Sequence, residues 1–359
     1  MSSLPLLNNN KITIAFHIQH FDYRGTGDVV YNYAHYNETV LKNQSVIVIS
    51  KQSLKNNYEI VIDRYMSRFP IYIYEDLNEL QQYCLNNNVT HFYALKYGKN
   101  DGIVLQPPIK NLIHCVYTTS ESHGDGKYFG VSETIDSKEY LYHIVKMNET
   151  KQNLRARLNI PENAVVFGRH GGTDTFLFPG IIDVIKTILD TYENVHFVFM
   201  PQPDILKQFE HPRIHHLPPT VNPEFKRKFI NTVDAMLHCS LLGESFGLSV
   251  LEFSYCNKPV ITFNGGKFVD KENTQHLKFL GDKALTYNNT QELLSVLKNF
   301  LITTRENVKK DWRTPILDQL TPEKIMQKFK LLLENNDCND NSSIINMLKN
   351  YKGKINYYD

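Results

Sequence analysis

The sequence lacks several features by which a protein class is often recognised. Its five cysteines include no C-x-x-C pair, so neither a zinc site nor a disulfide framework is indicated. Lys and Arg number 39 against 38 Asp and Glu, which gives no global electrostatic reason to expect nucleic acid as a partner. No apolar run approaches the ~20 residues of a membrane helix, and the first residues lack the charged and apolar regions of a signal peptide. We therefore expect a cytoplasmic protein without a transmembrane segment.

The chain, at 359 residues, is long enough for two domains of ordinary size. Patterns of buried strands and amphipathic helices alternate along it, which is typical of an α/β fold with parallel sheets. We predict strands at 11–18, 44–50, 70–75, 90–98, 112–118, 128–133, 165–172, 195–201, 213–219, 235–240 and 259–263, and helices at 28–41, 76–88, 140–147, 179–192, 222–233, 246–256, 289–301 and 321–334. A polar segment near 148–155 separates a first domain, 1–150, from a second, 151–320.

One stretch, residues 241–266 (LLGESFGLSVLEFSYCNKPVITFNGG), combines the features of a binding site. A buried strand precedes it, and a helix starts within it. The loop therefore leaves the carboxyl end of a strand and lies beside a helix N-terminus, where unpaired backbone N–H groups attract phosphate.

Two carboxylates in this stretch, Glu244 in the loop and Glu252 in the helix, are separated by roughly 10–12 Å if the helix forms. That exceeds the ~5–9.5 Å of two carboxylates that flank one glycosidic bond. The spacing favours a ligand with hydroxyl groups at two places and a diphosphate between them, which describes a nucleotide sugar. The alternative is a core helix with two solvated glutamates.

The succession Glu244-Ser-Phe-Gly-Leu followed by Glu252 resembles the E-x7-E element of glycosyltransferase family 4, commonly EGFGL…E. The resemblance implies that Glu244 contacts the transferred sugar, that Glu252 contacts the ribose, and that the backbone amides between them, in Ser245, Phe246, Gly247 and Leu248, contact the diphosphate. The downstream K-P-V-I and the pair Gly265-Gly266 are similar to the family's G-P-V-I and glycine turn, although Asn257-Lys258 stands where Gly is usual.

The resemblance also implies the fold, a GT-B arrangement of two facing Rossmann-like domains with the active site in the cleft between them. The first domain is then the acceptor side and the second the nucleotide-sugar donor side. Helix 321–335 crosses back to the first domain, and a polar tail, 336–359, follows.

Further donor-binding residues follow from the same resemblance. Arg169 matches the family's G-R, whose guanidinium neutralises the donor diphosphate. Gly171 and Gly172 stand where the family usually continues to a Lys, so one expected positive charge is missing. Gly25 and Gly27, in a loop after the first strand, face the donor phosphates, although a turn that merely lets the next helix pack is an alternative.

Two histidines are candidates on the acceptor side. His114 lies in an apolar strand, where a core residue with satisfied ring nitrogens is one interpretation, but in the resembled family a His on the corresponding strand lines the cleft beside the transferred sugar. His123 is a weaker candidate nearby. The cluster Lys226-Arg227-Lys228 is interpreted as the solvated face of a helix.

The function implied is retaining transfer of a sugar, of hexosyltransferase type, to a hydroxyl acceptor such as a glycan, with His114, Arg169 and Glu244 as catalytic residues. No D-x-D occurs in the chain, so we expect no metal ion, and no cofactor besides the nucleotide-sugar substrate. Two alternatives stay open: a nucleotide-sugar 2-epimerase of the same fold, and a non-catalytic scaffold that binds a sugar nucleotide or a glycan.

Overall fold

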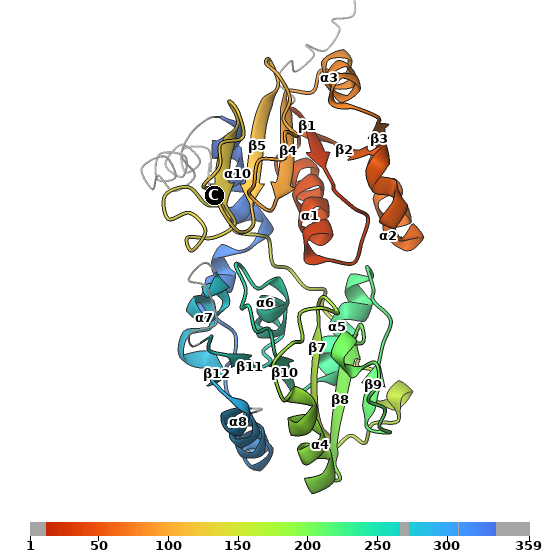
Figure 1. The fold of residues 1–359 in the computed structure, drawn as a ribbon, viewed down its shortest axis with the longest axis vertical. Helices are drawn as coiled ribbons and strands as arrows, with labels where there is room; N and C mark the ends of the chain where they lie inside the picture. The colour runs from red at the N-terminus through yellow and green to blue at the C-terminus, as the bar shows by residue number, and fades with distance from the viewer. Residues whose placement is uncertain (1–11, 266–272, 308, 335–359) are drawn as a thin grey trace, which may run out of the picture.

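The computed structural model describes residues 12–265, 273–307 and 309–334, which form two six-stranded parallel sheets, one in each half of the chain (Figure 1). The first sheet has the order β3-β2-β1-β4-β5-β6 and the second β12-β11-β10-β7-β8-β9. Its strands are β1 (Thr13–His17), β2 (Gln44–Ser50), β3 (Ile71–Tyr74), β4 (His91–Lys96), β5 (Lys110–Cys115) and β6 (Lys127–Gly130). The second contains β7 (Val165–His170), β8 (Val195–Met200), β9 (Ile214–His216), β10 (Ala235–His238), β11 (Val260–Phe263) and β12 (Ala284–Tyr287).

Helices cover these sheets and connect their strands. They are α1 (Gly25–Thr39), α2 (Glu59–Met66), α3 (Leu77–Asn86), α4 (Ile181–Thr191), α5 (Pro223–Thr232), α6 (Leu248–Tyr255), α7 (Gln275–Leu280), α8 (Thr290–Ile302), α9 (Thr304–Asn307) and α10 (Pro322–Leu333). Several begin at polar caps: Asp76, Asn222 and Asn289 each accept a hydrogen bond from a backbone N–H of the first turn. No described helix is long and apolar enough to cross a membrane.

The strand pattern explains why this architecture forms. All six residues of β8, VHFVFM, are buried, and so are all six of β4. Strands whose two faces are both covered by helices have continuous apolar sequences, because water is excluded from each side. In both sheets the strand order reverses beside the first strand of the domain, β1 or β7, which is the Rossmann-like order. Ligands of such sheets bind at that reversal, at the carboxyl ends of the strands.

The predicted helix at 140–147 is wrong, because this segment is extended. Leu141 donates its backbone N–H to Gly130, and Tyr140 forms an isolated parallel bridge to Gly130. Its apolar side chains are buried on successive residues rather than along one helical face. Sequence patterns also missed α2, α7 and β12.

The chain crosses between the domains twice. Leu141 to Val145 pack in the core of the first domain, whereas Met147 and Leu154 pack in that of the second. The return is made before α10, which contacts α1 (Figure 1). The Phe329 ring of α10 lies 5.3 Å from that of Tyr33 in α1. Two crossings of the chain thereby join the two halves. The predicted tail, 336–359, lies outside the described residues.

Candidate active site

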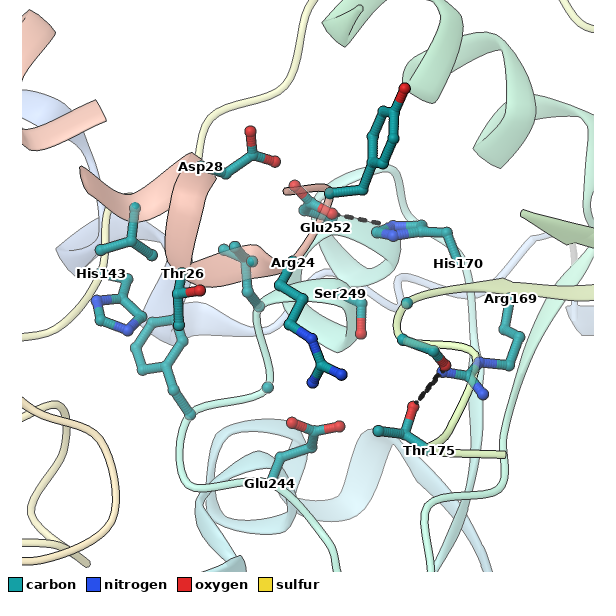
Figure 2. A pocket seen from close by; sticks show the side chains of 18 of the residues that line it. Arg24, Thr26, Asp28, His143, Arg169, His170, Thr175, Glu244, Ser249 and Glu252 are labelled. Atoms are coloured by element: carbon teal, nitrogen blue, oxygen red, sulfur yellow. Dashed lines mark hydrogen bonds and ion pairs between the residues drawn. The ribbon is translucent and has the colours of Figure 1, made fainter. Parts of the chain in front are cut away.

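A cavity of about 270 Å³ lies between the two domains, at the strand-order reversal of each sheet (Figure 2). Residues from the loops after β1 and β5 line it on one side. On the other side it is lined by residues from the ends of β7 and β8, from the loop after β10 and from the first turns of α6. The cavity therefore lies where the Rossmann-like topology leaves a crevice in both domains.

Arg169, at the end of β7, is buried at 5% exposure and lines the cavity. Its Nη2 donates to Thr175 Oγ1 at 2.6 Å and to the Gly172 carbonyl at 3.2 Å. Among the described residues, no acceptor meets its Nε or Nη1. Burial lowers the pKa of this guanidinium, because its charged form is less stable away from water. A nearby anion would stabilise the charged form and accept hydrogen bonds from the two nitrogens.

The Arg169 side chain turns toward the loop that follows β7, and Gly171 and Gly172 in that loop leave room for its guanidinium. Gly171 has a φ of +147°, and a Cβ there would lie 2.6 Å from Arg169 Nη2. Gly172 supplies the carbonyl that the guanidinium binds. Both line the cavity, as does Thr175. A side chain at 171 would displace the guanidinium, so the glycine is needed for the observed geometry.

Glu244 lines the cavity from the loop after β10 and is fixed by its neighbours. Its Oε1 lies 3.1 Å from His238 Nε2, and its backbone N–H donates to the Asn273 carbonyl at 2.7 Å. Burial raises the pKa of the carboxyl, but the hydrogen bond and charge of His238, with smaller contributions from His276 and Arg169, lower it further than burial raises it. The group is an oriented carboxylate at neutral pH.

Glu252, in α6, is part of a buried chain of charges. Lys226 Nζ lies 3.0 Å from its Oε1, and His170 Nε2 lies 2.9 Å from its Oε2. Lys226 also pairs with Asp28 of α1 at 2.9 Å, so it connects the two domains. The interpretation of Lys226 as solvated is wrong, since its side chain is only 14% exposed and turned toward two carboxylates.

The start of α6 faces the same cavity. Gly247 precedes the helix with φ +83°, and its Cβ, were it present, would lie 2.9 Å from the Cβ of His276. Within the described part of the chain, no side chain caps the N-terminus of this helix, so its first N–H groups are left for a ligand. Ser245, Phe246, Gly247 and Leu248 all line the cavity with Ser249. The Phe246 ring packs on His143, 4.7 Å between centroids.

The predicted glycines of the first domain differ in position. Gly25 is the first residue of α1 and lines the cavity. Gly27 is buried and lies outside the cavity lining; its carbonyl accepts from Tyr65 Oη at 2.6 Å. Arg24, missed by sequence reasoning, points into the pocket above Glu244 in Figure 2 and pairs across the domains with Asp174 at 3.1 Å.

The predicted histidines do not line the cavity. His114 is fully buried, with Nδ1 2.8 Å from Tyr93 Oη and Nε2 2.8 Å from the Leu141 carbonyl, so it is a core histidine with satisfied ring nitrogens. His123 is also buried, 3.1 Å from the Gly98 carbonyl. His143 lines the cavity instead, and no described residue meets its Nδ1. Sequence reasoning missed His143 because the segment 140–147 was predicted to be a helix.

Within the described residues, no group of three or more His, Cys, Asp or Glu side chains is arranged to hold a metal ion. Gly265 is described, with φ +87°, whereas Gly266 lies outside the described residues. Asn257 has φ +57° at the end of α6, a conformation that the Gly usual in the resembled motif takes easily and that Asn tolerates.

Solved structures share this fold at low sequence identity. A glycosyltransferase of Rickettsia africae matches with a TM-score of 0.65 and 12% identity, covering 92% of this chain and 100% of its own. The Anabaena protein HepE, solved in complex with UDP-glucose, matches with a TM-score of 0.61 and 12% identity over 90% of this chain and 100% of its own. A Listeria monocytogenes protein described as a UDP-N-acetylglucosamine 2-epimerase has a TM-score of 0.54 at 11% identity, over 91% and 98%.

The fold is the GT-B arrangement. The predicted fold class is therefore confirmed: two Rossmann-like domains with parallel six-stranded sheets and a cleft between them. No family model matches the chain, and no curated protein matches its sequence. Identities near 12% establish the GT-B fold alone, so membership of family 4 stays a prediction.

Proposed function

We propose that this GT-B protein is a retaining, metal-independent glycosyltransferase of hexosyltransferase type, which transfers a sugar from a nucleotide sugar to a hydroxyl acceptor. The observation that carries the proposal is the buried Arg169 guanidinium, with two unpartnered nitrogens, in one cavity with the uncapped start of α6. Both features bind anions. Glu244 and Glu252 line the same cavity, which suits a diphosphate carrying a sugar and a ribose.

In this mechanism, charge develops on the diphosphate as the bond to the sugar breaks. Arg169 turns toward the leaving diphosphate, and the N–H groups at the start of α6 stabilise the same charge. Arg24 supplies a second positive charge, in place of the Lys that the resembled family carries, because its ion pair with Asp174 is solvent-exposed and therefore weak. Lys226 does not fill this role because Asp28 and Glu252 neutralise it. The acceptor hydroxyl attacks from the face that the diphosphate leaves and passes its proton to a phosphate oxygen of the leaving diphosphate.

The two carboxylates act at opposite ends of the donor. Glu244, held as a carboxylate by His238, accepts hydrogen bonds from hydroxyls of the transferred sugar. Glu252 accepts from the ribose; each carboxylate oxygen has two lone pairs, so the contacts with Lys226 and His170 leave acceptor capacity. His143 takes the place beside the sugar that sequence reasoning assigned to His114. Burial lowers its pKa well below the ordinary value, so it acts as a neutral imidazole.

The deciding experiment is a calorimetric binding screen with UDP-, GDP- and TDP-sugars, followed by incubation of the tightest binder with candidate acceptors. We expect one nucleotide series to bind, and transfer or slow hydrolysis of its sugar to follow. Arg169→Ala should weaken this binding without abolishing it, and the exposed Arg157→Ala in the same domain is the matched control. Equal binding by both variants would remove Arg169 from the site and with it the basis of the proposal.

Product analysis separates this function from its alternatives. A 2-epimerase returns the nucleotide sugar with inverted configuration at one carbon and incorporates solvent deuterium there. A scaffold binds the donor and leaves it intact. The Listeria protein described as an epimerase shares this fold, so a 2-epimerase is the second candidate function. One fold can carry either activity, glycosyl transfer or epimerisation.

A further inference from the structure

Two tyrosines lie side by side on the first domain, where β4 and β5 end. Tyr97 is 57% exposed and Tyr117 is 41% exposed, yet their rings stack with centroids 4.6 Å apart and planes 28° apart. Tyr117 lines the cavity described above, and Tyr97 continues its aromatic surface beyond the cavity lining. Large aromatic side chains exposed together at a cavity mouth are typical of a binding surface.

The backbone fixes this pair in place. Tyr117 donates its N–H to the Tyr97 carbonyl at 3.0 Å, which continues the β4–β5 register beyond the strands. Gly98 follows with φ +118°, and a Cβ there would lie 1.9 Å from the Thr118 carbonyl oxygen. Only glycine permits so close an approach of the two loops. The tyrosines are therefore held as one preformed surface.

Polar contacts, one of them buried, hold the two loops together. His123 Nε2 lies 3.1 Å from the Gly98 carbonyl, which gives this histidine a positioning role. Asn100 donates its backbone N–H to the Glu121 carboxylate at 2.6 Å and its side-chain amide N–H to the Ser122 carbonyl at 2.9 Å. Because this surface is ordered before a ligand arrives, binding does not carry the entropic cost of ordering the two loops.

We propose that Tyr97 and Tyr117 form a stacking platform for a pyranose ring of the acceptor, so that the acceptor is a glycoside or glycan. This inference rests on the proposed function. Tyr117 lines the same cavity as Glu244, which is assigned to the transferred sugar, so a ring on the platform lies beside the reacting centre. The hydrogen-bearing face of a pyranose packs on aromatic rings, and its hydroxyls need a polar rim. The segment after Tyr117, Thr118 to Ser122 (TTSES), is polar throughout.

Ligand-observed NMR titration tests this platform. The probes are the methyl glycosides of glucose, galactose, mannose and N-acetylglucosamine, each with the protein saturated with whichever of UDP, GDP and TDP binds most tightly. We expect at least one glycoside to bind the wild type. Tyr97→Ala should weaken its affinity about three- to tenfold, and Tyr97→Trp should retain or improve it.

The matched control is Tyr83→Ala, from a second stacked pair, Tyr72 and Tyr83, at the outer edge of the same sheet, with centroids 3.6 Å apart. Its glycoside affinity should equal that of the wild type. A wild type that binds a nucleoside diphosphate but no glycoside, or a Tyr97→Ala protein that binds as tightly as Tyr83→Ala, overturns the platform and leaves the donor site standing. If none of UDP, GDP and TDP binds while the Tyr97-dependent glycoside affinity persists, the donor assignment falls and the platform stands.

Discussion

Lys226 Nζ lies 3.0 Å from Glu252 Oε1, and through this contact an α5 residue orients the carboxylate assigned to the ribose. The same ammonium group reaches Asp28 in the other domain, which is also paired with Arg64. Burial lowers the pKa of Lys226, but Asp28 and Glu252 raise it by more, so the charge is retained. One lysine thus couples the proposed donor site to the contact between the two domains.

Lys226→Met should lower the free energy of unfolding by about 3–5 kcal/mol, because a buried carboxylate loses its cation while the other keeps Arg64. Urea titration measures this. Lys228→Met is the control on the same helix: Lys228 pairs only at the surface with Glu224, an i,i+4 contact worth about 0.3–0.5 kcal/mol. Similar losses in both variants would contradict the role of Lys226 as a buried bridge.

The two carboxylates should respond differently to the two ends of the donor. Glu252→Gln should weaken both the free nucleoside diphosphate and the nucleotide sugar, each by about 1.5–3 kcal/mol. Glu244→Gln should weaken the nucleotide sugar alone, since only the transferred sugar contacts this carboxylate in the proposed arrangement. Calorimetry with both ligands gives four affinities. Parallel losses in the two variants would show that the roles are assigned wrongly.

Arg169→Ala should reduce turnover about 10²- to 10³-fold, the usual effect of removing one preorganised group that stabilises developing charge. The measurement is the release of nucleoside diphosphate under saturating donor. Thr175→Val is a companion variant, because it removes the hydroxyl that holds the guanidinium at 2.6 Å while keeping its charge. Its effect should be smaller, and a larger one would make Thr175 the more important group.

Chelation with EDTA should leave turnover unchanged, because the proposed charge stabilisation comes from Arg169, Arg24 and the start of α6. The assay is the same release of nucleoside diphosphate, with and without prior dialysis against EDTA. An activity lost on dialysis and restored by Mg²⁺ or Mn²⁺ would refute metal independence, while the donor site itself would stand.

Stability should fall as the pH is lowered from about 7 to about 4, because buried histidines are held neutral. Burial lowers the pKa of His91 to about 4 from 6.5, and that of His17 likewise. Between these values the unfolded chain binds protons that the folded chain does not, so each such histidine removes about 1.4 kcal/mol per pH unit as the pH falls. Urea titrations across this range measure the slope.

His91→Asn should reduce the slope of stability against pH by about 1.4 kcal/mol per pH unit, because the variant lacks one imidazole whose pKa is lowered by folding. The exposed His20→Asn is the matched control and should leave the slope as it is. If both variants keep the wild-type slope, His91 does not contribute to the pH dependence.

Part of the site was predictable because its residues are contiguous. Glu244 to Leu248 and Glu252 lie in one loop and one short helix, so their relation to each other follows from local geometry, and all of them line the cavity. Arg169 was likewise predictable from its place at the end of a strand. The function of these residues, however, came from a resemblance, and it stays a proposal.

The positions of other residues depend on long-range contacts that no local sequence pattern predicts. His114 and His143 both lie in apolar segments, and only the packing of the extended segment 140–147 on β5 sends one into the core and the other to the cavity. Gly27 and Lys226 were misread for the same reason: the first contacts Tyr65, and the second lies between carboxylates of two domains.

By itself, the sequence determined the two parallel sheets, because strands buried on both faces must be apolar throughout and helices must carry one apolar side. It also determined the donor loop, whose groups are neighbours along the chain. The tertiary structure alone decided which histidine faces the cavity, which lysine is buried and which tyrosines stack. These depend on side chains brought together by long-range packing rather than by spacing along the chain. That packing lies within the first domain for the histidines and tyrosines and between the two domains for Lys226.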